Sequence, residues 1–178
     1  MPDATDADLV VLARAWAASD PLASGVHRAG VPHLVAALRG RTGVVGPLVV
    51  PGVTSCLRCA DLHRRDADPR WPHLAAQLTA SEAPPSGATV TCLLTAATAA
   101  VQVLAYLDGG AAPATLEATI ELRPPDLTPR VRRWPAHAGC GCGAAPEGTS
   151  RLPATTRPGE LGPPPLGGLD RQQGPMGG

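Results

Sequence analysis

The stretch "GPLVVPGVTSCLRC", Gly46 to Cys59, carries an apolar run straight into two cysteines that are separated by two residues. The run belongs to a longer segment, Thr42 to Gly52, whose Val, Gly and Pro content predicts two strand pieces or a hairpin. A C-x-x-C pair after such a segment can be half of a zinc site, a redox dithiol or a chance pairing. Which of the three applies depends on the remaining cysteines.

A second cysteine pair lies far along the chain, in "AGCGCGA", where glycines on both sides let the backbone fold around a ligand. A redox dithiol would need no such distant C-x-C pair, whereas structural zinc takes four ligands and often four thiolates. The predicted metal ligands are Cys56, Cys59, Cys140 and Cys142. A closed four-thiolate site leaves no open coordination position, so we expect a structural clasp and no hydrolytic zinc chemistry.

The fifth cysteine and three histidines near these segments are weaker candidates. Cys92 lies in an apolar helical segment without a neighbouring base, so we expect it to behave as a small hydrophobe. His63 and His73 lie in a charged segment and are expected at the surface, and His137, shortly before Cys140, is expected to support the metal site without joining it. The sequence predicts no catalytic residue and no cofactor-binding residue.

Composition excludes some classes of function. The 178 residues include 15 basic side chains, all of them Arg, and 15 acidic ones. This balance lacks the electrostatic footprint of a nucleic-acid binder, and aromatic residues at 2% leave few rings on which bases could stack. We therefore expect no nucleic-acid partner. The length favours one domain, residues 1–143, followed by a Pro- and Gly-rich tail, residues 144–178, that we expect to be disordered.

The sequence also carries expectations about the compartment. The N-terminal residues show no basic region followed by a long apolar run, so no secretory signal is predicted. The longest apolar segment, Val90 to Leu107, is interrupted by Thr and Gln, which favours a buried core helix over a membrane span. Cysteines without a secretory signal favour metal binding or free thiols in a reducing cytosol. We expect a cytoplasmic protein without a membrane partner.

The N-terminal third predicts one βαβ unit. "DLVVLA", Asp8 to Ala13, is a short Val-rich run typical of a strand that is buried on both faces of a parallel sheet. Asp20 to Gly30 has an acidic start and a terminal glycine, as a capped helix does. Val31 to Leu38 is a second buried strand. Strand, helix and strand in this order predict a right-handed crossover.

The rest of the domain alternates helices and strands. The charged segment Ala60 to Leu78 predicts a surface helix or a loop broken at its prolines, and Thr89 to Leu107 predicts a long helix. Ala114 to Arg123 alternates apolar and polar residues, which predicts a half-exposed antiparallel strand. Arg130 to His137 can pair back as the second arm of a hairpin.

The order of these segments, and above all "GPLVVPGVTSCLRC" joined to the late "HAGCGC", resembles the C-terminal part of ThiF/MoeB-type proteins. These are bacterial relatives of ubiquitin-activating enzymes, and the resemblance is strongest to divergent ThiF-like proteins of peptide-modification clusters. It covers about residues 7 to 143. It implies an α/β fold with a partial Rossmann-like sheet, a C-terminal antiparallel hairpin and a four-cysteine zinc site.

The resemblance also implies a chemistry that this chain matches only in part. Family members use ATP and Mg²⁺ to adenylate the C-terminal carboxylate of a carrier protein or peptide, with a glycine-rich loop, an Arg contributed across a dimer, a Lys and an Asp. Here no G-x-G-x-x-G precedes Asp8, Lys is absent, and Ala15 aligns with the Asp. Adenylation needs a phosphate cradle and a balancing cation. We expect structural Zn²⁺ in this chain, and ATP with Mg²⁺ only in complete family members.

Two functions follow from these expectations. The first is an adenylyltransferase-like protein that lacks the N-terminal ATP-binding half and acts with a partner in activating a carrier-protein or peptide carboxylate. The alternative is a non-catalytic, zinc-stabilised module that binds a peptide or carrier protein. An incomplete parallel sheet leaves an edge and an apolar face uncovered, so we expect a homodimer or a hetero-complex.

Overall fold

The computed structural model describes residues 6–14, 17–80 and 87–145, so the predicted tail lies almost wholly outside the described residues. Within them the chain forms five strands and four helices. In chain order these are β1 (Val10–Leu12), α1 (Pro21–Arg28), β2 (His33–Arg39), β3 (Thr42–Val49), α2 (Leu57–Ala67), α3 (Trp71–Ala80), α4 (Thr89–Asp108), β4 (Ala118–Leu122) and β5 (Pro129–Arg133).

The strands form one sheet in the order β1-β2-β3-β4-β5. β1 and β2 are parallel and joined through α1, which confirms the predicted βαβ unit. The expectation that the first strand is buried on both faces is wrong, because β1 lies at the edge of the sheet and Val11 is 46% exposed. From β2 onward every neighbouring pair is antiparallel, so the sheet is mixed. The segment from Thr42 is a single strand that forms a hairpin with β2; the alternative of two separate strand pieces is therefore wrong.

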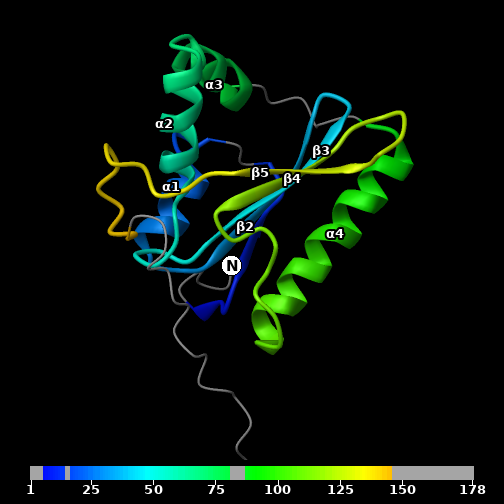
Figure 1. Cartoon of the computed structure of the whole chain (residues 1–178), viewed down its shortest axis with the longest axis horizontal. Helices are drawn as coiled ribbons and strands as arrows, with labels where there is room; N and C mark the ends of the chain where they lie inside the picture. The colour runs from blue at the N-terminus through cyan, green and yellow to red at the C-terminus, as the bar shows by residue number, and fades with distance from the viewer. Residues whose placement is uncertain (1–5, 15–16, 81–86, 146–178) are drawn as a thin grey trace, which may run out of the picture.

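Helices cover both faces of the sheet (Figure 1), with α4 on one side and α1 and α2 on the other. Alternation along β2 distributes its side chains between these layers. Leu34 packs in a cluster with Ala99 of α4, whereas the next residue, Val35, packs with Val26 of α1 and Leu57 of α2. The core therefore lies in two layers, one on each side of the sheet.

The helix α1 begins where the sequence indicated. The Asp20 carboxylate accepts hydrogen bonds from the backbone N–H groups of Leu22 and Ala23, which satisfies donors that the first turn leaves unpaired. The charged segment that follows the cysteine pair forms two helices, α2 and α3, and the chain breaks between them at Pro69. Pro72 does not break α3, because it lies in the first turn, where no intrahelical N–H is needed.

The helix α4 packs lengthwise on the sheet. A Cβ on Gly43 of β3 would lie 2.0 Å from the Thr95 hydroxyl oxygen, so only glycine permits this close approach. The helix ends at Gly109, whose left-handed φ of 64° suits a residue without a Cβ. Its buried residues form one row along the helix: Thr91, Thr95, Ala99 and Gln102.

The prediction that this apolar segment is a buried core helix is wrong for most of its surface. By length and composition alone the helix could cross a membrane: its most apolar 18-residue window has a mean hydropathy of 1.8, and 22% of that window is buried. Cys92 of this helix is exposed as well. The large apolar side chains that α4 exposes are Val90, Leu93, Leu94, Val101, Leu104 and Leu107.

The last hairpin is confirmed, although its burial differs from the prediction. β4 and β5 pair antiparallel from Ala118↔Arg133 to Leu122↔Pro129. All five residues of β4 are buried, so the predicted half-exposed strand is wrong. The polar face is covered because the Trp134 indole N–H donates to the Thr119 hydroxyl at 3.1 Å. In contrast, every residue of β5 is exposed.

Candidate metal centre

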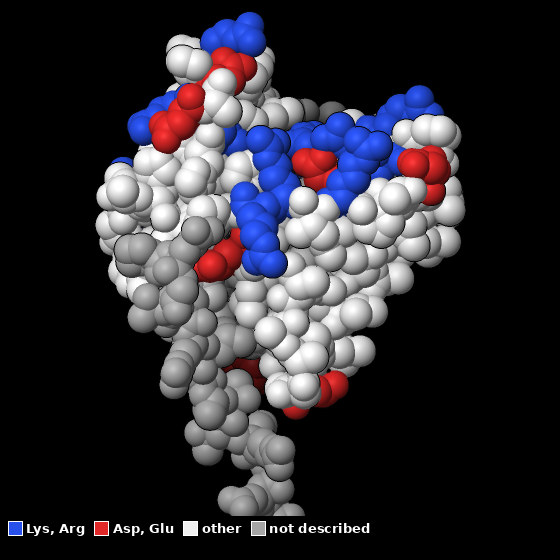
Figure 2. Space-filling view, in the orientation of Figure 1, with Lys and Arg blue, Asp and Glu red and all other residues white. Residues whose placement is uncertain are grey.

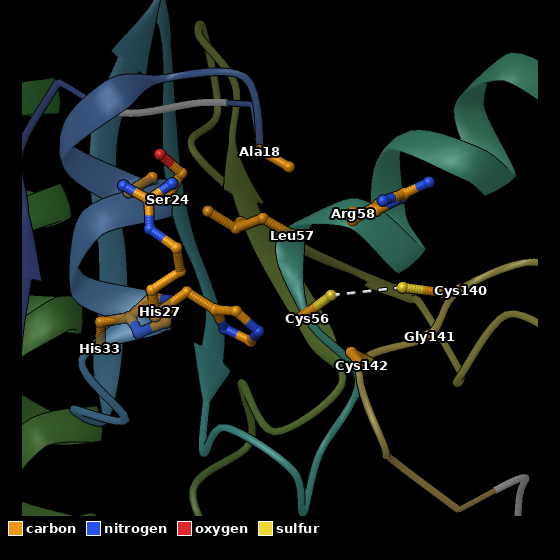
Figure 3. Close-up of a pocket in the computed structure, with 12 residues that line it drawn as sticks. Ala18, Ser24, His27, His33, Cys56, Leu57, Arg58, Cys140, Gly141 and Cys142 are labelled. Carbon is orange, nitrogen blue, oxygen red and sulfur yellow. Dashed lines mark hydrogen bonds between the residues drawn. The ribbon is translucent and has the colours of Figure 1, made fainter.

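The structure brings together the four cysteines that the sequence singled out. Cys56 precedes the first residue of α2, and Cys59 lies in the first turn. Cys140 and Cys142 lie on the loop after β5 and face α2 (Figure 3). The four sulfur atoms all lie within 4.8 Å of one another. The sulfur of Cys56 is 3.6 Å from that of Cys140 and 4.0 Å from that of Cys59, and the sulfurs of Cys59 and Cys142 are 3.6 Å apart.

These separations fit a tetrahedral metal ion. Zinc–sulfur bonds of about 2.3 Å place the sulfurs of a regular tetrahedron about 3.8 Å apart. Three of the six sulfur–sulfur distances, 3.6, 3.6 and 4.0 Å, lie close to that spacing, and all six are within 4.8 Å. They are far longer than a disulfide bond of about 2.05 Å, and all five cysteines are free. A donor set made only of thiol sulfur suits a soft metal and not Mg²⁺ or Ca²⁺.

The thiols also share protons unequally. The Cys56 thiol donates to the sulfur of Cys59, which lowers the pKa of Cys59 and raises that of Cys56. A backbone hydrogen bond from His137 further favours the Cys59 thiolate. Burial raises the pKa of Cys140 to about 11. Cys59 therefore loses its proton more readily than Cys56 or Cys140, and a metal that binds Cys56 and Cys140 must displace their protons.

A turn between β3 and α2 positions the first cysteine pair. The Thr54 hydroxyl oxygen accepts a hydrogen bond from the Val50 N–H at 2.9 Å and closes this turn. Ser55 then ties the turn to the last hairpin: its hydroxyl donates to the Trp134 carbonyl at 2.5 Å, and its N–H donates to the Glu117 carboxylate at 3.2 Å. No local pattern predicts the role of Ser55, because its partners lie far away along the chain.

One face of α2 holds the loop that carries the second pair. Cys59, His63 and Asp66 follow at helical spacing and therefore share this face. His63 donates through Nε2 to the Pro135 carbonyl at 3.0 Å, and the Asp66 carboxylate lies 2.7 Å from Nε2 of His137. His63 is half-buried, so the expectation of a surface histidine is wrong for it. The missed residue is Asp66, which the C-x₃-H-x₂-D spacing could have indicated.

His137 supports the loop and is not among the clustered sulfur ligands. Its Nδ1 accepts from the Gly139 N–H at 2.9 Å, and its carbonyl accepts from the Cys140 N–H at 2.8 Å. The candidate metal group in the described residues consists of the four cysteines without this histidine. His73 is exposed, as expected, and Ala15 lies outside the described residues.

A cavity of about 270 Å³ lies between α1 and the cysteine loop (Figure 3). His33, only 1% exposed, lines it. Its Nδ1–H donates to the Val31 carbonyl at 2.9 Å, while Nε2 has no hydrogen-bond partner among the described residues. Burial lowers the pKa of His33 below its usual value, so the ring stays neutral near pH 7.

No family model matches this sequence, and no curated protein matches it. The fold is similar to that of Escherichia coli MccB, with a TM-score of 0.57 and 22% sequence identity over 80% of this chain and 43% of MccB. MccB with ATP matches with a TM-score of 0.56 at 22% identity, over 81% of this chain and 43% of the other.

The microcin C7 biosynthetic enzyme MccB in complex with N-formylated MccA matches with a TM-score of 0.55 at 21% identity, over 81% of this chain and 45% of that chain. The present chain thus spans less than half the length of the solved structures that it matches. Identity at this level shows that the fold is shared, whereas function depends on the residues of the site.

Proposed function

We propose that this chain is the C-terminal part of a ThiF/MoeB-type activating system. It acts with a partner polypeptide in activating the carboxylate of a peptide or carrier protein, in the cytoplasm. The observation that carries the proposal is a fold shared with under half of MccB, a protein solved with ATP and with MccA. The partial Rossmann-like character of the sheet rests on the parallel β1–β2 pair joined through α1.

Structural Zn²⁺ is the metal that we assign to the four cysteines. Four sulfur ligands at tetrahedral spacing support zinc, and this closed set leaves no position for water or substrate. The ion would join the start of α2 to the loop after β5, which are otherwise held by hydrogen bonds of Ser55 and His63. Its role is to fix the last hairpin against the β3–α2 turn.

ATP does not fit the residues of this chain. The chain has no Lys, and in the described residues no glycine-rich phosphate loop follows a strand. Because nucleotide triphosphate needs donors and cations at its phosphates, we derive no nucleotide step from these residues. We propose that a partner polypeptide supplies them, and the exposed apolar surface of α4 supports contact with such a partner.

Metal analysis and ATP–pyrophosphate exchange on the purified chain test this proposal together. We expect about one zinc per chain, loss of most of it in Cys140→Ser, and no exchange by the chain alone. Exchange by the isolated chain would contradict the need for a partner. A chain that contains no zinc after expression in zinc-sufficient medium would contradict the clasp.

The alternative, a non-catalytic peptide- or carrier-binding module, is favoured by the same missing phosphate ligands. The two functions differ when the chain is combined with a nucleotide-binding partner from the same gene neighbourhood. Exchange in the mixture supports an activating system, whereas peptide binding without exchange in any mixture supports the module.

A further inference from the structure

The edge strand β5 carries an arginine surface. β5 is the last strand of the sheet, and all five of its residues are exposed. Figure 2 shows basic side chains gathered in a band over β4 and β5, and all of them are Arg because the chain has no Lys. Within the described part of the chain no strand pairs with the outer side of β5, so its backbone N–H and C=O groups are available there.

Side chains alternate along β5 in a defined way. Arg130 and Arg132 lie opposite Glu121 and Thr119 of β4, and Val131 between them lies opposite Ile120. Residues directly opposite in a sheet point to the same face, so the two arginines share one face and Val131 points to the other. An added strand beside β5 would therefore meet charge at alternate positions and an apolar side chain between them.

This face has more positive than negative charge. Glu121 forms ion pairs with Arg39, at 2.8 Å, and with Arg123. This face therefore already binds one carboxylate between two guanidinium groups. Among the described residues neither Arg130 nor Arg132 has a carboxylate within 4.0 Å. Arg130 attracts Asp126 only at longer range.

Arg132 is also held in place. Its guanidinium carbon lies 4.6 Å from the centre of the Trp134 ring, and Arg64 lies 4.5 Å from the same ring. Burial lowers the pKa of Arg64, its ion pair with Asp61 at 3.0 Å opposes that shift, and repulsion by Arg39 and Arg132 adds to it to a smaller extent. These cations therefore crowd one another, and an anion brought to this face would relieve the repulsion.

We propose that β5 binds an acidic peptide segment, which adds to the sheet as its next strand. Carboxylates at alternate positions of the segment pair with Arg130 and Arg132, and apolar residues between them meet Val131. Charged side chains on an edge usually prevent strand pairing, but they attract a strand of opposite charge. Arginine suits this role because its planar guanidinium pairs with carboxylates through two hydrogen bonds. The inference rests on the proposed function only for the natural source of the segment.

Fluorescence anisotropy on the full chain tests the proposal with a labelled probe of alternating Glu and Val. We expect the double variant Arg130→Gln/Arg132→Gln to bind this probe about tenfold more weakly, since each exposed pair contributes modestly. Two controls test whether the loss of charge alone weakens binding. Arg28→Gln/Arg70→Gln removes two exposed cations elsewhere, and Arg133→Gln removes a cation from the opposite face of β5; both should bind nearly as the native chain does.

A probe that is N-methylated at alternate residues separates strand addition from simple charge attraction. It keeps the charges but removes the N–H donors facing β5, and we expect it to lose most of its affinity. Three results would overturn the proposal: unchanged binding by the double variant, equal binding of the methylated probe, or tighter binding of single-stranded RNA than of the acidic peptide. None of these results depends on zinc content or nucleotide exchange, so this inference and the proposed function fail independently.

Discussion

Two buried titratable side chains, His33 and Glu121, lower stability on acidification over different pH ranges. His33 has a lowered pKa in the folded chain, chiefly because burial disfavours its charged form. Glu121 is also buried, but hydrogen bonds and charges of Arg123 and Arg39 outweigh that burial and lower its pKa. For His33, stability falls as the pH drops below the unfolded pKa of about 6.5. For Glu121, stability falls as the pH drops from the unfolded pKa of about 4.5 through the lower folded pKa.

His33→Asn tests the first range. Asparagine can keep a donor for the Val31 carbonyl but cannot become charged. Between about pH 7.5 and pH 5.5 the native chain should lose more unfolding free energy than the variant, because only the unfolded native chain takes up the extra proton. Urea unfolding at both pH values measures the difference. Identical pH dependence in the two proteins would show that the folded His33 titrates normally.

Glu121→Gln tests the second residue. At neutral pH we expect it to lower the unfolding free energy by about 1–3 kcal/mol, because Arg39 and Arg123 lose their shared carboxylate. The deficit should shrink as the pH falls through the folded pKa of the native carboxyl. Asp126→Asn, at an exposed carboxylate, serves as the control and should change stability by less than about 0.5 kcal/mol. A deficit no larger than that of the control would contradict the account.

At the scale of elements, α2 is the part that holds the cysteine loop. Asp66→Ala should release the His137 ring and speed metal loss to a chelator by up to about 10-fold, because the loop that carries Cys140 and Cys142 then loses one of its contacts with α2. Asp68→Ala is the matched control, because this carboxylate pairs with Arg70 and not with the loop. Equal rates of metal loss in the two variants would mean that the Asp66–His137 contact does not support the cluster.

Local signals predicted several elements, and burial was predicted less well. Asp20 predicted the start of α1 because a capping carboxylate binds backbone N–H groups only two and three residues further along the chain. The sequence predicted that the two cysteine pairs lie together, because a structural zinc ion needs four ligands around it. β4 was misjudged because Trp134 and arginine side chains, which no local pattern reveals, cover its polar face. α4 was misjudged because an apolar composition does not say which neighbour covers the helix.

At the scale of the whole molecule, the exposed apolar surface of α4 predicts association. Val101 and Leu104 are 60% and 56% exposed, on a helix without a charged residue before Asp108. We expect the purified native chain to form a homodimer or to require a partner for solubility. Val101→Glu/Leu104→Glu should shift sedimentation to the monomer, whereas Leu22→Glu, at an equally exposed position on α1, should not. A stable, monodisperse native monomer would contradict this expectation.

The central claim is that four thiolates from two distant segments hold one zinc ion and fix the fold. Zinc K-edge X-ray absorption on the purified chain tests it most directly, because the spectrum reports the identity and distance of the metal's neighbours. We expect four sulfur neighbours at about 2.3 Å. Nitrogen or oxygen neighbours in place of sulfur, or a spectrum unchanged by Cys140→Ser, would contradict it.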